Sequence, residues 1–211
     1  MTRKGLKLLS LAAALFISEP SFAGEEPPGV ATSAPAKPTA ARSAKPAPGH
    51  TACEREMLRA SKQHGVPLGM LYAVGLTETG RAGSLQPYAL NVEGKASYGL
   101  TLDQALQLFD AARRKGAKLI DLGCMQINYH YHGEHFRSVQ EMLEPHRNVA
   151  YAAKFLKQLK AREGSWTMAV ARYHAGPDND PAQKRYVCSV IRKMVKTGFG
   201  SWTANSRRFC G

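Results

Sequence analysis

The segment from Leu68 to Thr79 constrains the fold more than any other feature, because it is apolar on nearly every side when wound as a helix. A helix of that kind cannot lie on a surface, so other elements must cover it and it must form the centre of a core. Its last turn nevertheless carries one acid, Glu78, in the sequence GLTETG. The chain therefore needs neighbouring elements that enclose this segment, and Glu78 is placed where that core ends.

The enclosing elements are predicted to be mostly further helices. Residues 52–64 form the first, which ends at Gly65 and Pro67, because glycine ends helices and proline disfavours helix at the residue before it. Thr101 followed by Gln104 is a capping box that begins another helix. Four more helices are expected to begin at Ser138, Asn148, Ser165 and Asp180, the last of them being the final helix of the chain.

A short β-hairpin is predicted between the helices. Tyr88, Leu90 and Val92 alternate with other residues before the turn pair Glu93-Gly94, which is the pattern of two short strands joined by a tight turn. The expected fold is thus all-α, a single small helical domain with one inserted β-hairpin.

The first 49 residues are predicted to lie outside this domain. Residues 1–23 have the pattern of a cleavable signal peptide, with a basic start, a short apolar run and a small-residue cleavage site. The apolar run is too short for a stable membrane anchor, so we expect an exported, periplasmic protein. Residues 24–49 hold six prolines and seven alanines and are predicted to be a disordered linker. Residues 50–211 remain as the folded domain.

The folded domain is basic, with 23 Lys and Arg residues against 13 Asp and Glu residues after residue 49. An exported basic domain suits an anionic partner such as the cell wall, a membrane surface or nucleic acid. The chain has no recognisable nucleic-acid-binding motif, so nucleic acid is not expected as a partner.

Four cysteines, Cys53, Cys124, Cys188 and Cys210, fall in the folded domain. An even number in an exported protein indicates disulfides rather than metal ligation, and no C-x-x-C pair is present. Three complete pairings are possible. Because chain ends tend to lie close together, we favour a bond from Cys53 to Cys188 or Cys210.

Glu78 is the leading candidate for chemistry. Burial and the negative end of the helix dipole both raise the pKa of a carboxyl group at the end of an apolar helix. A glutamic acid that stays protonated near neutral pH can act as a general acid. The alternative is an ordinary solvated glutamate at a helix end.

Two other stretches form an ordered set of motifs with Glu78. The set reads Glu78-Thr79, then Gly123-Cys124-Met125-Gln126, then Arg172-Tyr173-His174-Ala175-Gly176, with Pro145 and Asn148 before a helix between the last two. Over about residues 52–195 the chain thereby resembles the lytic transglycosylases of the soluble-lytic-transglycosylase (SLT) type, whose fold resembles goose-type lysozyme. The resemblance implies an α+β, lysozyme-like domain. Cys124 and His174 depart from the family pattern, which has leucine and asparagine there.

The resemblance implies a peptidoglycan-cleaving enzyme that needs no cofactor. Glu78 would protonate the glycosidic oxygen between MurNAc and GlcNAc and then take a proton from the 6-hydroxyl group, leaving 1,6-anhydro-MurNAc. Thr79, Met125 and Gln126 would contact the sugar, and Tyr173 would bind substrate and help to position the acid. The 48 positions from Glu78 to Gln126 exceed those of typical soluble members and resemble members associated with secretion, conjugation, or pilus and flagellum assembly.

A hydrolase of the two-carboxylate kind would need a second acid to hold a nucleophile or a water. Asp103 is explained as a first-turn helix acid, Glu93 as a turn residue, and Asp121 as the cap of the turn into Gly123. None of them is therefore expected to act as the second acid. Two alternatives stay open, a lysozyme-like muramidase hydrolase and a noncatalytic peptidoglycan-binding scaffold.

The stretch YHYHGEH is rich in histidine and contains His130, His132, Glu134 and His135. It does not match the H-E-x-x-H zinc motif, so solvated or packed histidines are expected and no metal site is assigned. A zinc-dependent wall hydrolase that uses this cluster is a third alternative.

Overall fold

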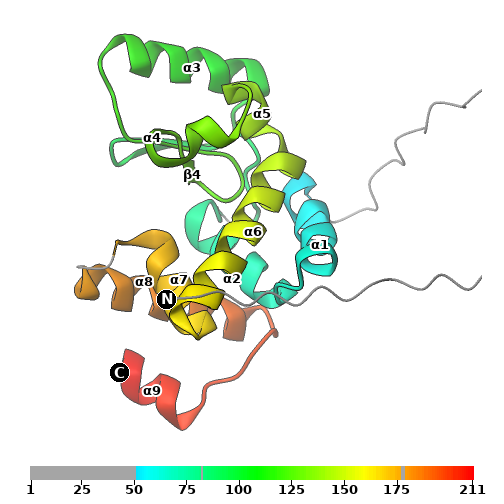
Figure 1. Cartoon of the computed structure of the whole chain (residues 1–211), viewed down its shortest axis with the longest axis vertical. Coiled ribbons are helices and arrows are strands. Elements are labelled where there is room, and N and C mark those ends of the chain that lie inside the picture. Colours follow the sequence, from blue (N-terminus) through cyan, green and yellow to red (C-terminus); the bar gives the residue numbers. More distant parts are fainter. Residues whose placement is uncertain (1–50, 82, 177–178) are drawn as a thin grey trace, which may run out of the picture. The chain divides into compact units, whose positions relative to one another are not determined.

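The computed structural model describes residues 51–81, 83–176 and 179–211. The signal peptide and the linker predicted for residues 1–49 lie outside these ranges. None of the helices within them has the length and apolar character needed to cross a membrane. The described helices are α1 (Ala52–His64), α2 (Leu68–Glu78), α3 (Leu102–Arg114), α4 (Tyr129–His132), α5 (Val139–Leu143), α6 (Pro145–Glu163), α7 (Trp166–His174), α8 (Asp180–Lys196) and α9 (Ala204–Cys210), with a 3-10 helix at Gly133–His135 (Figure 1).

Helix α2 forms the centre of the core, as its sequence predicts. Seven of its eleven residues are buried, and the helix packs against α1 and α8. Gly75 lets α1 approach closely, because a side chain at this position would collide with Met57. The buried helix ends at Glu78, so this acid lies where the core meets the surface.

The local signals for helix ends are confirmed at α1 and α3. Helix α1 spans the predicted residues, and Gly65 ends it in the left-handed conformation at φ 67°. At α3 both halves of the capping box are present: the Thr101 hydroxyl accepts from the Gln104 N–H at 3.2 Å, and Gln104 Oε1 accepts from the Thr101 N–H at 2.9 Å.

The prediction that Asn148 caps a helix is wrong. Helix α6 begins at Pro145, because the fixed φ and the missing N–H of proline suit the first position of a helix. Asn148 lies in the first turns of α6 and is fully buried. The inward residues predicted for this helix are nevertheless buried, namely Val149, Ala152, Ala153, Leu156 and Leu159.

The predicted hairpin is confirmed as β1 (Leu90–Val92) and β2 (Lys95–Ser97), with Glu93 and Gly94 in the turn at φ 49° and 89°. Two strands that were not predicted, β3 (Ile120–Leu122) and β4 (Ile127–Asn128), extend it to an antiparallel sheet in the order β2-β1-β3-β4. At three and two residues, β3 and β4 are shorter than the runs of about four to eight residues by which strands are recognised in a sequence. The fold class is otherwise as predicted, mostly helical with a small antiparallel sheet.

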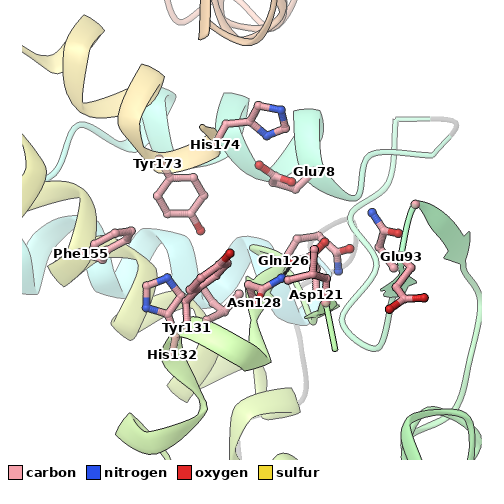
Figure 2. Close-up of a pocket in the computed structure, with 14 residues that line it drawn as sticks. Glu78, Glu93, Asp121, Gln126, Asn128, Tyr131, His132, Phe155, Tyr173 and His174 are labelled. Atoms are coloured by element: carbon pink, nitrogen blue, oxygen red, sulfur yellow. Dashed lines mark hydrogen bonds between the residues drawn. The ribbon is translucent and has the colours of Figure 1, made fainter. Parts of the chain in front are cut away.

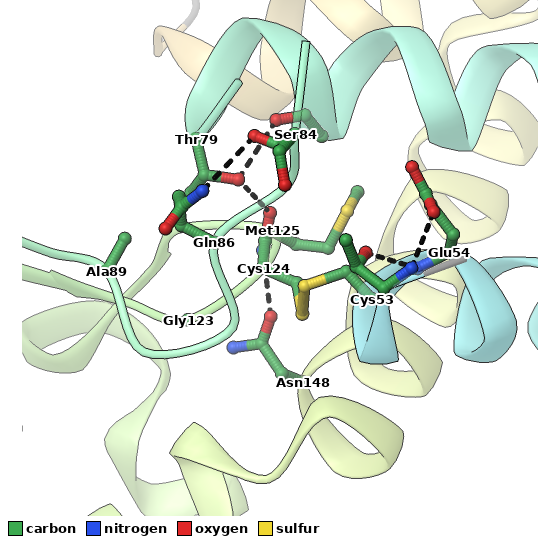
Figure 3. Close-up of a disulfide and its surroundings, with 12 residues drawn as sticks. Cys53, Glu54, Thr79, Ser84, Gln86, Ala89, Gly123, Cys124, Met125 and Asn148 are labelled. Atoms are coloured by element: carbon green, nitrogen blue, oxygen red, sulfur yellow. Dashed lines mark hydrogen bonds between the residues drawn. A yellow bond between two sulfur atoms is a disulfide. The ribbon is translucent and has the colours of Figure 1, made fainter. Parts of the chain in front are cut away.

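The expected pairing of Cys53 with Cys188 or Cys210 is wrong. Cys53 at the start of α1 bonds to Cys124 in the turn between β3 and β4 (Figure 3), and Cys188 on α8 bonds to Cys210 on α9. Helix α9 follows the helix that was expected to be the last. The second cysteine pair is therefore used to fasten this extra helix to α8 rather than to join the two ends of the domain.

Candidate active site

A cleft of about 370 Å³ opens beside the end of α2. Its walls come from α2, the sheet, and helices α4, α6 and α7 (Figure 2). The residues that line it are Glu78, Asn91, Glu93, Gly94, Leu119, Asp121, Gln126, Ile127, Asn128, Tyr131, His132, Phe155, Tyr173 and His174. A concave site that combines aromatic rings with several amide and carboxyl groups is suited to a sugar, which presents both apolar faces and hydroxyl groups.

Glu78 reaches the cleft from the last turn of α2. Burial is the main cause that raises the pKa of its carboxyl group, from an ordinary value of 4.5 to about 8. A hydrogen bond from Tyr186 opposes this rise, and the negative charge of Asp121 adds to it. Glu78 is therefore protonated at neutral pH and can donate a proton to a group bound in the cleft.

Tyr186 on α8 holds the Glu78 side chain, because its hydroxyl donates a hydrogen bond to Oε1 of the carboxyl group. Burial, followed by the charge of Glu78, raises the pKa of the Tyr186 hydroxyl well above its usual value, so this hydroxyl keeps its proton. The His174 ring stacks on the Tyr186 ring with centroids 4.2 Å apart and planes 3° from parallel. Since Tyr186 occupies Oε1, the acidic proton of Glu78 is left to Oε2.

Gln126 projects into the cleft from the turn that joins β3 to β4. Its backbone is left-handed at φ 46°, and its side-chain Nε2 donates to the carbonyl groups of Ala89 at 3.1 Å and Gly123 at 3.0 Å. Gly123 has φ 78°, and a side chain at this position would meet the Asn148 amide. The glycine is thus required for both the turn and its contact with α6.

The structure places Thr79 and Met125 behind the cleft rather than in its lining. The Thr79 hydroxyl donates to the carbonyl oxygens of Gly75 at 3.2 Å and Cys124 at 3.1 Å (Figure 3). Met125 is fully buried. These two residues hold the end of α2 against the turn between β3 and β4, which differs from the sugar contacts that the resemblance implies.

Tyr173 lines the cleft, but its hydroxyl does not contact Glu78. It donates to the carbonyl oxygen of Met125 at 2.7 Å, and burial raises its pKa well above the usual value. In this structure the direct hydrogen bond to Glu78 comes from Tyr186, and the positioning role expected of Tyr173 stays a prediction. Tyr173 instead supports the turn that carries Gln126.

Asp121 was expected to cap the turn into Gly123, but the structure places it elsewhere. It lies in the middle of β3, where it pairs with Asn91 on β1 and Asn128 on β4. All three side chains line the cleft. Asn128 Nδ2 donates to Asp121 Oδ1 at 2.7 Å, whereas Asn91 Oδ1 is buried and has no hydrogen-bond partner in the described part of the chain.

The histidine-rich stretch packs against aromatic rings. His132 stands 2.9 Å from the Tyr151 hydroxyl through Nδ1 and packs edge-on against Phe155, while His135 stacks on Tyr151. Burial is the main cause that lowers the pKa of His132. Within the residues that the structure describes, no three His, Cys, Asp or Glu side chains are arranged to hold a metal ion.

Several residues of the site were not found from the sequence, and the most important of them is Tyr186, which contacts Glu78 although it does not line the cleft. It lies on the inward face of α8 with Gln183, Val187 and Val190, so the helical pattern marks it as a buried residue. A tyrosine on a buried face usually has a hydrogen-bond partner, but the pattern alone does not show that the partner is Glu78.

The fold and this cleft together define a lysozyme-like domain of helices around a small sheet. The family model of the Transglycosylase SLT domain matches residues 56–193, and the chain belongs to this family. Membership indicates peptidoglycan as the substrate and cleavage of its glycan strands as the general activity. Comparison with curated proteins and with solved structures found no match.

Proposed function

We propose that the protein is a lytic transglycosylase that cleaves the β-1,4 bond between MurNAc and GlcNAc with Glu78 as its catalytic acid. The protonated carboxyl group of Glu78, which has a pKa of about 8 and lines a cleft of sugar-binding character, is the observation that carries the proposal. Gln126 is proposed to bind the sugar, because it presents an amide to the same cleft.

The reaction needs one carboxyl group that acts twice. Glu78 Oε2 gives its proton to the bridging oxygen, and the bond between that oxygen and C1 of MurNAc breaks. The 6-hydroxyl group of the same MurNAc then attacks C1, and its proton passes to the Glu78 carboxylate. The product is 1,6-anhydro-MurNAc, no water is consumed, and Glu78 is ready for another cycle.

The variant Glu78→Gln tests this proposal on purified peptidoglycan sacculi. An amide cannot protonate the leaving oxygen, so we expect release of soluble muropeptides to fall by roughly 10²-fold to 10⁴-fold. Glu144→Gln is the matched control, because Glu144 is exposed and does not line the cleft. Wild-type turnover in Glu78→Gln would end the assignment of this acid.

Mass spectrometry of the products separates the proposal from its alternatives. Anhydro ends from the wild-type protein support a transglycosylase, and reducing ends support a lysozyme-like hydrolase. Binding to sacculi without release of muropeptides supports a noncatalytic scaffold.

We further propose that the enzyme works in the periplasm and opens the wall locally for a secretion, conjugation, pilus or flagellar apparatus. Two disulfides favour an oxidising compartment. The long insertion that holds β1, β2 and α3 between Glu78 and Gln126 supports the specialised role. Fractionation of cells tests the location, and assembly of the apparatus in a strain that carries only Glu78→Gln tests the role.

A further inference from the structure

A row of three polar side chains crosses the sheet on the cleft wall that faces Glu78. Asn91 on β1, Asp121 on β3 and Asn128 on β4 are paired directly across the strands. Residues that are directly opposite in antiparallel strands project from the same face of the sheet, and all three residues line the cleft. Figure 2 shows Asp121 and Asn128 together on this wall, with Glu78 on the α2 side of the cleft.

Asn128 fixes the orientation of the Asp121 carboxyl group. Its Oδ1 accepts from the His130 N–H at 3.0 Å, and this bond caps the start of α4. Its Nδ2 donates to Asp121 Oδ1 at 2.7 Å. Because an amide oxygen can only accept, the bond to His130 determines which end of the amide faces Asp121. The carboxyl group is therefore held through Oδ1, and Oδ2 has no hydrogen-bond partner among the described residues.

Asp121 and Glu78 have different electrostatic surroundings. Burial raises the pKa of both groups, and the pKa of Glu78 reaches about 8. The hydrogen bond from Asn128 lowers the pKa of Asp121 and so opposes the effect of burial. The charge of the Asp121 carboxylate is itself one of the causes that raise the pKa of Glu78, so Glu78 keeps its proton while it faces the ionised Asp121.

We propose that Asp121 is a second catalytic carboxylate, held in place by Asn128, which stabilises the positive charge that develops at C1 of MurNAc. This inference rests on the proposed transglycosylase function. As Glu78 protonates the bridging oxygen, the electron pair of the breaking bond leaves with that oxygen and C1 becomes electron-poor. A fixed anion on the opposite wall stabilises this state more than the neutral substrate, which lowers the barrier. Asp121 forms no bond and transfers no proton.

The variant Asp121→Asn tests the role of the charge, because an amide of the same size can still accept from Asn128. On soluble, uncrosslinked glycan strands we expect kcat to fall about 10²-fold, with KM and the midpoint of thermal unfolding little changed. We also expect the alkaline limb of the pH profile to move to lower pH, because the negative charge that helps to raise the pKa of Glu78 is gone. A wild-type kcat in this variant would overturn the inference.

The variant Asn128→Asp tests the positioning role. It keeps an acceptor for the His130 N–H, but it places a carboxylate where Asp121 had a donor, so the pKa of Asp121 should rise. The acidic limb of the pH profile is then expected to move to higher pH, and a lower rate with an unmoved limb would contradict the positioning role. Asn205→Asp on α9 is the control, since Asn205 is exposed and lies outside the cleft lining. The titratable groups that line the cleft with Asp121 and enter this profile are Glu78, Glu93, Tyr131, His132, Tyr173 and His174.

The products separate failure of this inference from failure of the proposed function. If Glu78→Gln is inactive while Asp121→Asn forms anhydro ends at the wild-type rate, only the role of Asp121 is lost. If Asp121→Asn removes reducing ends and leaves anhydro ends, Asp121 holds a water instead of stabilising C1, which also contradicts the inference. If Glu78→Gln keeps full turnover, the proposed function itself falls.

Discussion

At the scale of single residues, the buried carboxyl group of Glu78 should make the stability of the protein depend on pH. Its pKa is about 8 in the folded protein, against an ordinary value of 4.5, so the folded state binds more protons than the unfolded state between these values. The free energy of unfolding contributed by this group therefore falls as pH rises from about 4.5 to 8, and the destabilisation is complete above pH 8.

The variant Glu78→Gln should remove this penalty, because its side chain is neutral at every pH. Each unit of pKa corresponds to about 1.4 kcal/mol, so we expect the variant to gain on the order of 5 kcal/mol over the wild type at pH 9 and little at pH 5. Chemical unfolding at the two pH values measures the difference. Equal differences at both would mean that the carboxyl group is not buried, and Glu144→Gln, which replaces an exposed glutamate, is the control.

Residue types in sequence order predicted the raised pKa of Glu78 but not the residues that surround it. Glu78 could be found because a lone carboxyl group at the end of an apolar helix has one physical consequence, a raised pKa. The tyrosine that contacts it could not be chosen, since Tyr173 and Tyr186 both lie on buried faces and only the packing of α7 and α8 decides which one reaches the acid. Asp121 was misassigned for a similar reason, because its neighbour across the sheet is Asn128, seven positions away.

At the scale of elements, Asn148 joins α6 to both the β3–β4 turn and α5. Its Oδ1 accepts from the Met125 N–H at 2.9 Å, and its Nδ2 donates to the carbonyl oxygens of Leu122 at 2.8 Å and Met142 at 2.9 Å. The side chain is fully buried. One amide therefore satisfies three backbone groups that have no access to water.

The variant Asn148→Ala should lower the free energy of unfolding by about 4 kcal/mol, because it leaves three buried backbone groups without partners. It should also lower the cleavage rate, since the loosened turn carries Gln126 into the cleft. Denaturant unfolding and muropeptide release measure the two effects, with the exposed Asn205→Ala as the control. A loss below about 1 kcal/mol would show that the turn does not depend on this residue.

Helices were easier to predict than strands because their signals are local. Caps such as Thr101 with Gln104 act within one turn of chain, and the structure has α1 and α3 where these signals place them. Strand β3 depends instead on pairing with β1, which is about 30 positions earlier, and β4 depends on pairing with β3. The prediction for Asn148 was wrong because an asparagine near a helix start has the same sequence signature whether it caps the helix or is buried against another element.

At the scale of the whole molecule, the two disulfides have different relations to the cleft. The bond between Cys53 and Cys124 spans 71 positions and joins α1 to the turn that holds Gln126 (Figure 3). The bond between Cys188 and Cys210 spans 22 positions and fastens α9 to α8, and no residue of α9 lines the cleft. Local sequence patterns do not report such pairings, because they follow from how distant elements pack.

Removing the two disulfides one at a time should therefore lower the stability in both cases but the cleavage rate in only one. Replacement of both Cys53 and Cys124 by alanine is expected to cost about 4 kcal/mol and that of Cys188 and Cys210 about 3 kcal/mol, because the larger closed loop restricts the unfolded chain more. The first pair should also lower the cleavage rate, since α1 no longer anchors the turn beside Asp121 and Gln126. The second should keep the wild-type rate at temperatures where the domain stays folded. Thermal unfolding and muropeptide release on the same samples measure both quantities, and an equal loss of rate in the two variants would show that α9 supports the cleft through α8, where Tyr186 lies close to Cys188.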